Sequence, residues 1–235
     1  MRVPRRSWTK MGRLMVACLL VVLAAGTAVY AETIPNKPLQ LVVPYGPGGG
    51  TDITARLVAP ELEKELGVPV QVINIAGGGG WVAWHQMANW KPDEWIIGYV
   101  NLPHIFAYLN PEMKRKETLE SWNFLLLHVV DPGMIVVREK DPRFRTLEEF
   151  IKYVQENPGK ITIAAHGVGG DDFLGIKQIE MAIPNFKVNI IHDNSDSTSI
   201  AQLMGGHVDA VGANVGVYTP RILEGKIRPL CVNWY

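Results

Sequence analysis

Two glycine-rich turns are the parts of this sequence best suited to bind a ligand. PYGPGGGTD at 44–52 follows an apolar run and precedes an amphipathic segment, and HGVGGDD at 166–172 has the same surroundings. The first N–H groups of a helix lack partners within the helix, and the helix dipole favours an anion beside them. We therefore expect the amides of Gly48 to Asp52 to hold one carboxylate and those of Val168 to Asp171 to hold another.

The spacing of the glycines argues against a nucleotide. A Walker A loop ends in Gly-Lys-Ser or Gly-Lys-Thr, whereas the first turn ends in Gly50-Thr51-Asp52. A dinucleotide fingerprint fails as well, because Thr51 stands where its third glycine belongs. Neither turn contains Lys or Arg, so main-chain dipoles and water would meet the anion. Such a site favours a small organic acid of modest charge.

The acidic residues of the turns also have a purely structural interpretation. Thr51 can cap the first helix while Asp52 complements its dipole, as Asp171 and Asp172 can in the second. The sequence leaves both interpretations open.

Alternating strands and helices are expected to position the two turns. Short apolar runs rich in β-branched residues alternate with amphipathic segments, which is typical of a parallel α/β sheet. The expected strands are Leu39–Val43, Val70–Asn74, Ile96–Val100, Phe124–Val130, Met134–Arg138, Ile161–Ala165, Val188–Ile191, Val208–Ala213 and Ile227–Val232. The expected helices are Thr51–Leu66, Gly80–Trp90, Leu147–Asn157, Asp171–Ala182, Thr198–Gly205 and Tyr218–Glu224.

The amino terminus has the pattern of a secretory signal peptide. Five basic residues precede an apolar run from Leu14 to Ala25, and AVYA at 28–31 offers a cleavage site after Ala31. These 31 residues hold five of the 23 Lys and Arg and none of the 23 Asp and Glu, so the remainder is mildly acidic. No basic stripe remains for nucleic acid. Cys231 is the only cysteine beyond the signal peptide, which excludes an internal disulfide there.

Enzyme motifs are missing from the sequence. It contains no G-x-S-x-G, HExxH or C-x-x-C, and its six histidines occur singly, so we predict no catalytic residue, metal site or cofactor. His166 and His192 fall at strand ends, where a general base could lie, but a hydrogen-bonded loop histidine is the simpler interpretation. Trp81 and Trp84 could line one side of a ligand pocket, although packing of their helix against the sheet is the simpler interpretation.

Four longer stretches carry a resemblance to a known family. They are NKPLQLVVPYGPGGGTDITARLVAPELEKELGVPVQVINIAGGGGWVAWHQMA from Asn36, GYVNLP at 98–103, HGVGGDD at 166–172 and LMGGHVDAVGANVG at 203–216. Together they resemble the Bug-type extracytoplasmic solute receptors, the binding component of tripartite tricarboxylate transporters.

The resemblance implies an α/β, two-lobed type II periplasmic-binding-protein fold. Its lobes would close by a hinge on a di- or tricarboxylate or an acidic amino acid, and the protein would be a periplasmic monomer that delivers the ligand to membrane permease subunits. The implied first lobe is 32–104 with a returning strand at 227–235, and the second is 105–226. The implied contacts are Tyr45, Pro47, Gly48, Gly49, Gly50, Thr51, Asp52 and Asn101 in the first lobe, and Gly167, Val168, Gly169, Gly170, Asp171 and Asn214 in the second.

The sequence departs from the family in two places that bear on function. The turn after Val188–Ile191 is usually rich in glycine, but here it reads HDNSDSTS at 192–199, which would change the rim of the cleft. Family members also continue beyond the position of Tyr235, so we expect the C-terminal part of the first lobe to be missing. A periplasmic sensor for a signalling kinase would need the same clamp and stays an alternative, and a small-acid enzyme is a weaker one.

Overall fold

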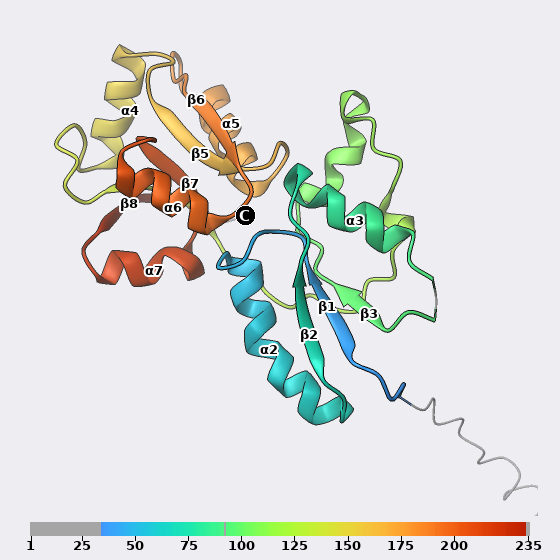
Figure 1. Ribbon diagram of the computed structural model, residues 1–235. Helices are drawn as coiled ribbons and strands as arrows, with labels where there is room; N and C mark the ends of the chain where they lie inside the picture. Colours follow the sequence, from blue (N-terminus) through green and yellow to red (C-terminus); the bar gives the residue numbers. More distant parts are fainter. Residues whose placement is uncertain (1–33, 92, 234–235) are drawn as a thin grey trace, which may run out of the picture. The chain divides into compact units, whose positions relative to one another are not determined.

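The structure, a computed structural model, describes residues 34–91 and 93–233. The expected signal peptide of residues 1–31 lies outside the described residues. The chain from Asn36 onward forms one compact unit, which contains a three-stranded and a five-stranded sheet (Figure 1). We call the two sheets with their helices the first and the second lobe.

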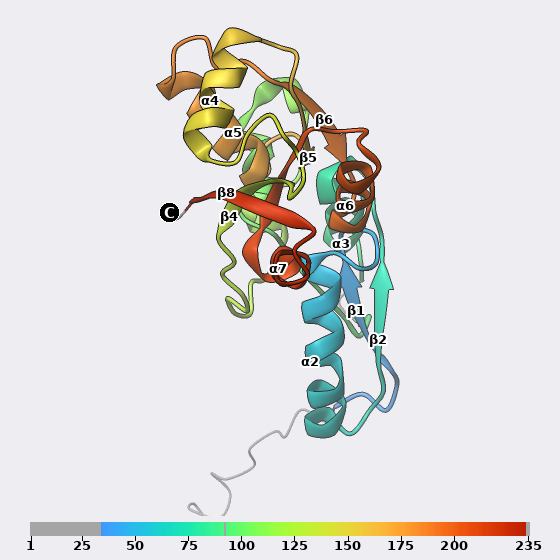
Figure 2. The same cartoon turned by 90° about the vertical axis from the view of Figure 1, so that its left-hand side faces the viewer.

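The sheet of the first lobe is wholly parallel. β1 (Leu39–Val43) lies between β2 (Val70–Asn74) and β3 (Ile96–Gly98). The helix α2 (Gly50–Leu66) runs along β1 and β2, as both ribbon views show (Figures 1 and 2). It ends at Gly67, whose φ of 69° gives the left-handed cap that glycine adopts readily.

The helix α3 (Trp81–Ala88) forms a second packing layer of the first lobe. Trp81 and Trp84 are buried and lie edge to face with ring centroids 5.6 Å apart, so they are core residues as expected, but their apolar cluster contains no residue of the described strands on which packing was predicted. Ile105 is buried in the same cluster, and Trp122 packs against it. The segment from 105 to 122 therefore packs with the first lobe, and the boundary expected at residue 104 is too early. This segment contains the short 3₁₀ turns His104–Leu109, Pro111–Met113 and Leu119–Ser121, and a further one lies at Gly78–Gly80.

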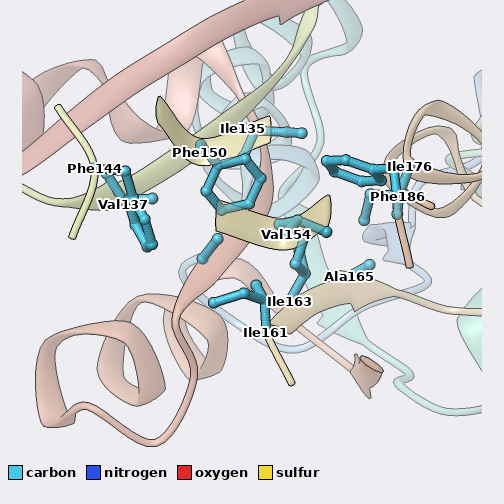
Figure 3. Close-up of a cluster of buried hydrophobic side chains, with 11 residues drawn as sticks. Ile135, Val137, Phe144, Phe150, Val154, Ile161, Ile163, Ala165, Ile176 and Phe186 are labelled. Carbon is cyan, nitrogen blue, oxygen red and sulfur yellow. The ribbon is translucent and has the colours of Figure 1, made fainter. Parts of the chain in front are cut away.

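The sheet of the second lobe has the strand order β6-β5-β7-β4-β8. Its strands are β4 (Gly133–Arg138), β5 (Thr162–His166), β6 (Asn189–Asp193), β7 (Ala210–Asn214) and β8 (Ile227–Asn233). The helices between them are α4 (Leu147–Glu156), α5 (Asp171–Ala182), α6 (Asp196–Gly205) and α7 (Val215–Leu223). Two apolar clusters fill its core, and Phe150 and Val154 of α4 point into one of them beside Ile163 of β5 (Figure 3).

The second sheet departs from the expectations in its direction and its membership. β5 is parallel to β6 and β7, but β4 is antiparallel to both of its neighbours, so the sheet is mixed. β8 pairs with β4, so the strand expected to return to the first lobe belongs to the second. β4, whose residues 133–137 are all buried, is thereby paired on both edges, with β7 on one side and β8 on the other.

The run Phe124–Val130 is not a strand, contrary to expectation. All seven of its residues are exposed, and no backbone hydrogen bond joins it to another described residue. A run with strong β propensity forms a strand only where it pairs with a partner, and this run pairs with none of the described strands.

Candidate functional site

The first turn delivers the start of α2 to the carboxyl end of β1. Gly49 is the N-cap, its backbone is extended, and it makes no side-chain cap hydrogen bond. The expected cap by Thr51 is therefore wrong: Thr51 lies in the first turn, where its hydroxyl accepts a hydrogen bond from the Asn101 side-chain amide at 3.1 Å. Because a glycine cap offers no side-chain acceptor, the first amides of α2 depend on groups from elsewhere.

Asp52 fastens this turn to its own lobe. Its buried carboxylate accepts hydrogen bonds from the amide of Gly48 at 2.9 Å, the side-chain amide of Asn74 at 2.9 Å and the Nε of Arg56 at 3.0 Å. Burial alone would raise the pKa of Asp52, but the bonds from Arg56, Gly48 and Asn74 outweigh it and lower the pKa. These contacts support the structural interpretation of Asp52, since its carboxylate is already bound by the protein.

The second turn repeats the glycine cap at the carboxyl end of β5. Gly170 caps α5 without a side-chain hydrogen bond, and a Cβ at this position would lie 2.3 Å from Nε2 of His104 and 2.5 Å from the carbonyl oxygen of His166. Only a residue without a side chain fits there. Asp171 follows, and one of its oxygens accepts a hydrogen bond from the side-chain amide of Asn214 at 2.9 Å.

Three side chains connect the two turns. The rings of Tyr45 and His104 lie edge to face with centroids 5.8 Å apart, and Nδ1 of His104 is 3.9 Å from a carboxylate oxygen of Asp171. A Cβ on Gly167 would lie 2.9 Å from Cα of Gly79, so the glycine loop before α3 also touches the second turn. The structure thus brings the two predicted turns together.

Asp196, at the start of α6, crosses between the lobes. One of its carboxylate oxygens accepts a hydrogen bond from the backbone amide of Gly50 at 3.0 Å. Beside it, the Ser197 hydroxyl donates to the carbonyl oxygen of Pro47 at 3.2 Å. The amide of Gly46 donates to the carbonyl oxygen of Asn194 at 3.3 Å. The sequence-based prediction required the amides of the first turn to be free for a ligand. Two of them are not, because the amides of Gly48 and Gly50 bind the protein's own carboxylates.

His166 connects Asp196 to a second buried acid. Its Nδ1 is 2.9 Å from an oxygen of Asp172 and its Nε2 is 3.6 Å from an oxygen of Asp196. Burial lowers the pKa of His166, but the bond to Asp172 and the charge of Asp196 exceed that effect and raise the pKa to about 10. The ring is therefore a cation at neutral pH. His166 is hydrogen-bonded, as the loop-histidine interpretation expected, but its positive charge was not predicted.

Several buried polar atoms of this region make no hydrogen bond within the described residues. They are the Tyr45 hydroxyl, Oδ1 of Asn101, both ring nitrogens of His104, Nε2 of His166, and Oδ1 of Asp172 and of Asp196. Buried polar groups normally have partners, so such a concentration marks a place where a ligand or water completes the bonding. The region offers both donors and acceptors to that ligand.

The other predicted contact residues have diverse surroundings. Val168 is 44% exposed and Pro47 is exposed, so both lie at the rim. Gly48 and Gly169 have φ of 80° and 87°, which only the glycine backbone adopts without strain. Asn214 is occupied by Asp171 and by the carbonyl oxygen of Asp131 at 3.3 Å. Ligand contact by any of these residues stays a prediction.

Sequence reasoning missed His104, Asp172 as a partner of His166, and Asp196. His104 lies in a segment of weak periodicity with no motif around it. Asp196 belongs to the polar turn at 192–199, which the sequence singles out as unusual, but only the fold shows that this turn reaches Gly50.

One open depression lies away from these turns. It has a volume of about 310 Å³ and is lined by residues at the amino ends of β1 and β3, among them Lys37, Trp90 and Trp95. Parallel sheets bind ligands at the carboxyl ends of their strands, so this depression is not the candidate site. Among the described residues, no helix is long and apolar enough to cross a membrane.

Known proteins match the chain over most of its length. A curated relative, a UPF0065 protein of Bordetella pertussis, is 29% identical over 225 residues, which is 92% of this chain and 66% of the relative. The chain spans between 60% and 69% of the length of the curated relatives it matches.

Solved structures agree with the fold. The periplasmic binding protein BugD is 29% identical, with a TM-score of 0.75 over 84% of this chain and 66% of BugD. MatC from Rhodopseudomonas palustris, solved with bound malate, has a TM-score of 0.76 over 84% of this chain and 67% of MatC, and at 23% identity it supports the fold alone. The two-lobed periplasmic-binding-protein fold is thereby confirmed. Residues 54–234 match the family described as the tripartite tricarboxylate transporter family receptor, and the chain belongs to that family.

Proposed function

We propose that this chain is the solute-capturing part of a periplasmic receptor, which binds a small organic acid between its lobes and delivers it to membrane permease subunits. Membership of a transporter receptor family supports a role in binding and transport rather than catalysis. The pattern of residues 1–31 supports export, and a single clamp per chain fits a monomer.

The observation that carries the proposal is the convergence of two glycine-capped helix starts. Both α2 and α5 follow the carboxyl end of a parallel strand, and neither receives a cap from the side chain of its own N-cap residue. Tyr45, His104 and Asp171 connect the two starts. Main-chain amides of this kind bind carboxylates well, because the helix dipole adds to the hydrogen bonds. In the structure the amide of Gly50 already binds a carboxylate, that of Asp196, which a ligand carboxylate would replace.

A thermal-shift screen of the purified chain tests the proposal. The panel contains monocarboxylates, dicarboxylates such as malate, tricarboxylates and amino acids, with ATP as the comparison ligand. A ligand at about 100 times its dissociation constant stabilises a fold by roughly 2.7 kcal/mol, which gives a clear rise in Tm. We expect at least one acid to raise Tm. A rise with ATP alone, or with no compound, contradicts the proposal.

Asn101 offers a matched pair of variants for the same assay. Its Oδ1 is buried and has no hydrogen-bond partner in the described part of the chain, whereas Asn89 at the end of α3 is exposed. We expect Asn101→Ala to weaken binding of the acid found in the screen by about tenfold, the loss of one good hydrogen bond. Asn89→Ala should bind as the unaltered chain does. Equal affinities for the two variants would exclude Asn101 from the site.

A further inference from the structure

His104 brings a side chain of the first lobe into the second turn. A Cβ on Gly170 would lie 2.3 Å from Nε2 of its ring, and a Cβ on Gly167 would lie 3.7 Å from its Cδ2. Any larger residue at Gly170 would therefore overlap the ring. His104 is 5% exposed, and the ring of Tyr45 meets it edge to face from the first turn. The second turn thus forms a glycine-lined seat for a ring that the other lobe supplies.

The seat offers His104 no hydrogen bond. Both ring nitrogens are buried, and neither has a partner among the described residues. Nδ1 lies 3.9 Å from a carboxylate oxygen of Asp171, which is too far for a hydrogen bond. His166 differs, because Nδ1 of that ring lies 2.9 Å from an oxygen of Asp172. A neutral imidazole has one N–H to leave unbonded and a protonated one has two, so the seat suits the neutral ring.

The charges around His104 do not compensate for its burial. Burial has the largest effect on its pKa and lowers it, and the positive ring of His166 lowers the pKa further. The charge of Asp171 and the carbonyl group of His166 act in the opposite direction without cancelling the shift. Tyr45 stays neutral, since burial raises its pKa well above the usual value. Asp172 contacts His166, and burial raises the pKa of Asp172 to about 6, so a test in this pH range has to report on His104 itself.

We propose that His104 is a positioning residue, which holds the two glycine turns together while its ring is neutral and lets the lobes part when it takes up a proton. The proposal rests on the proposed function, since it concerns the regulation of the same site. The compact form has no acceptor for a charged ring, whereas water would solvate that ring in an open form. By linkage, the open form gains population as the pH falls below about 6.5, and its weight relative to the compact form rises by up to about thirtyfold at pH 5.

Small-angle X-ray scattering of the purified chain without ligand, at pH 7.5 and pH 5, tests the proposal. We expect a larger radius of gyration at pH 5. His104→Gln keeps a polar side chain that takes up no proton, so its radius should be the same at both pH values. His207→Gln, at an exposed histidine, should expand as the unaltered chain does. A constant radius of the unaltered chain, or an equal expansion in His104→Gln, overturns the proposal.

NMR of the imidazole nitrogens shows the proton on His104 directly. The signals of His104 are those that are missing from the spectrum of His104→Gln. We expect a neutral ring at pH 7.5 and uptake of a proton over the pH range in which the unaltered chain expands. Expansion while the ring stays neutral, or a ring that is protonated at pH 7.5, overturns the proposal. This measurement also decides if His104→Gln is expanded at both pH values, a result that supports the positioning role.

Neither measurement uses a ligand, so this inference and the proposed function can fail separately. If the thermal-shift screen finds an acid and the radius does not respond to pH, only this inference fails. If the radius responds to pH and no acid raises Tm, the proposed function fails, and a pH-dependent contact between the lobes is what remains.

Discussion

At the scale of single residues, the acids of the site divide into one that holds the protein together and others that face the ligand region. The carboxylate of Asp52 accepts hydrogen bonds from Gly48, Asn74 and Arg56 within its own lobe. Asp172 and Asp196 each keep an oxygen without a donor among the described residues. The sequence marks all of them as acidic residues near helix starts, and only their contacts separate the two roles.

Replacing Asp52 by Ala should destabilise the fold. The change removes the charged acceptor that the Gly48 amide and the Asn74 side chain share, and a hydrogen bond to a charged group contributes about 1.5–3 kcal/mol. Urea denaturation followed by circular dichroism measures the free energy of unfolding. Glu61→Ala, an exposed position on the same helix, is the control and should change it by less than about 0.5 kcal/mol. If the two variants lose equally little, Asp52 is not the anchor of the turn.

His166 should make the stability depend on pH in the alkaline range. Its pKa in the folded protein is about 10, above the value of roughly 6.5 expected for the unfolded chain. The folded state therefore holds the proton more tightly, and the stability this gives is full below about pH 6.5 and is lost as the pH rises toward 10.

Urea denaturation at pH 6 and pH 9.5 measures this loss, which should amount to a few kcal/mol, on the order given by linkage for such a shift. In His166→Gln the loss between the two pH values should be smaller. His207→Gln, at an exposed histidine, should follow the unaltered chain. A pH dependence that is the same in all three proteins would show that His166 is not the group responsible.

At the scale of elements, the strands and helices follow closely from local sequence. β1, β2 and α5 have the predicted limits, because β1 and β2 are short apolar runs that each follow a proline, and α5 begins directly after a glycine turn. The pairing of the strands cannot be predicted in the same way. No feature of the run Ile227–Val232 predicts that it pairs with β4, since the choice of edge depends on which other strands need a neighbour. The site follows the same division: both turns are legible in the sequence, but the arrival of Asp196 at Gly50 requires the fold.

The contrast between Phe150 and Leu126 tests the assignment of core and surface. Phe150 is fully buried in the cluster of Figure 3, where its ring meets Phe144 edge to face at 5.0 Å. Phe150→Ala should cost about 3–5 kcal/mol, through lost burial and the cavity left behind. Leu126 lies in the run predicted as a strand and is 76% exposed, so Leu126→Ala should cost less than about 0.5 kcal/mol. A large loss from Leu126→Ala would show that this run is covered in the folded protein.

At the scale of the whole molecule, the protein's own groups join the two lobes. The hydrogen bonds that cross between them include those from Gly46 to Asn194, from Gly50 to Asp196 and from Ser197 to Pro47. Of these, the bond to Asp196 is the one that involves a charged group, and such bonds are stronger than neutral ones. Asp196 can thus hold the lobes together in the place of a ligand carboxylate, and a ligand then needs to supply less of the closing free energy.

This role predicts a change of size on removing the carboxylate. Small-angle X-ray scattering of the ligand-free protein should give a larger radius of gyration for Asp196→Ala than for the unaltered chain, because more molecules populate an open form. Asp196→Asn keeps an acceptor for the Gly50 amide and should lie between the two. Adding the acid found in the screen should return Asp196→Ala to the compact value, since the start of α2 is then free to take a ligand carboxylate. An Asp196→Ala protein as compact without ligand as the unaltered chain would show that the other contacts between the lobes suffice for closure.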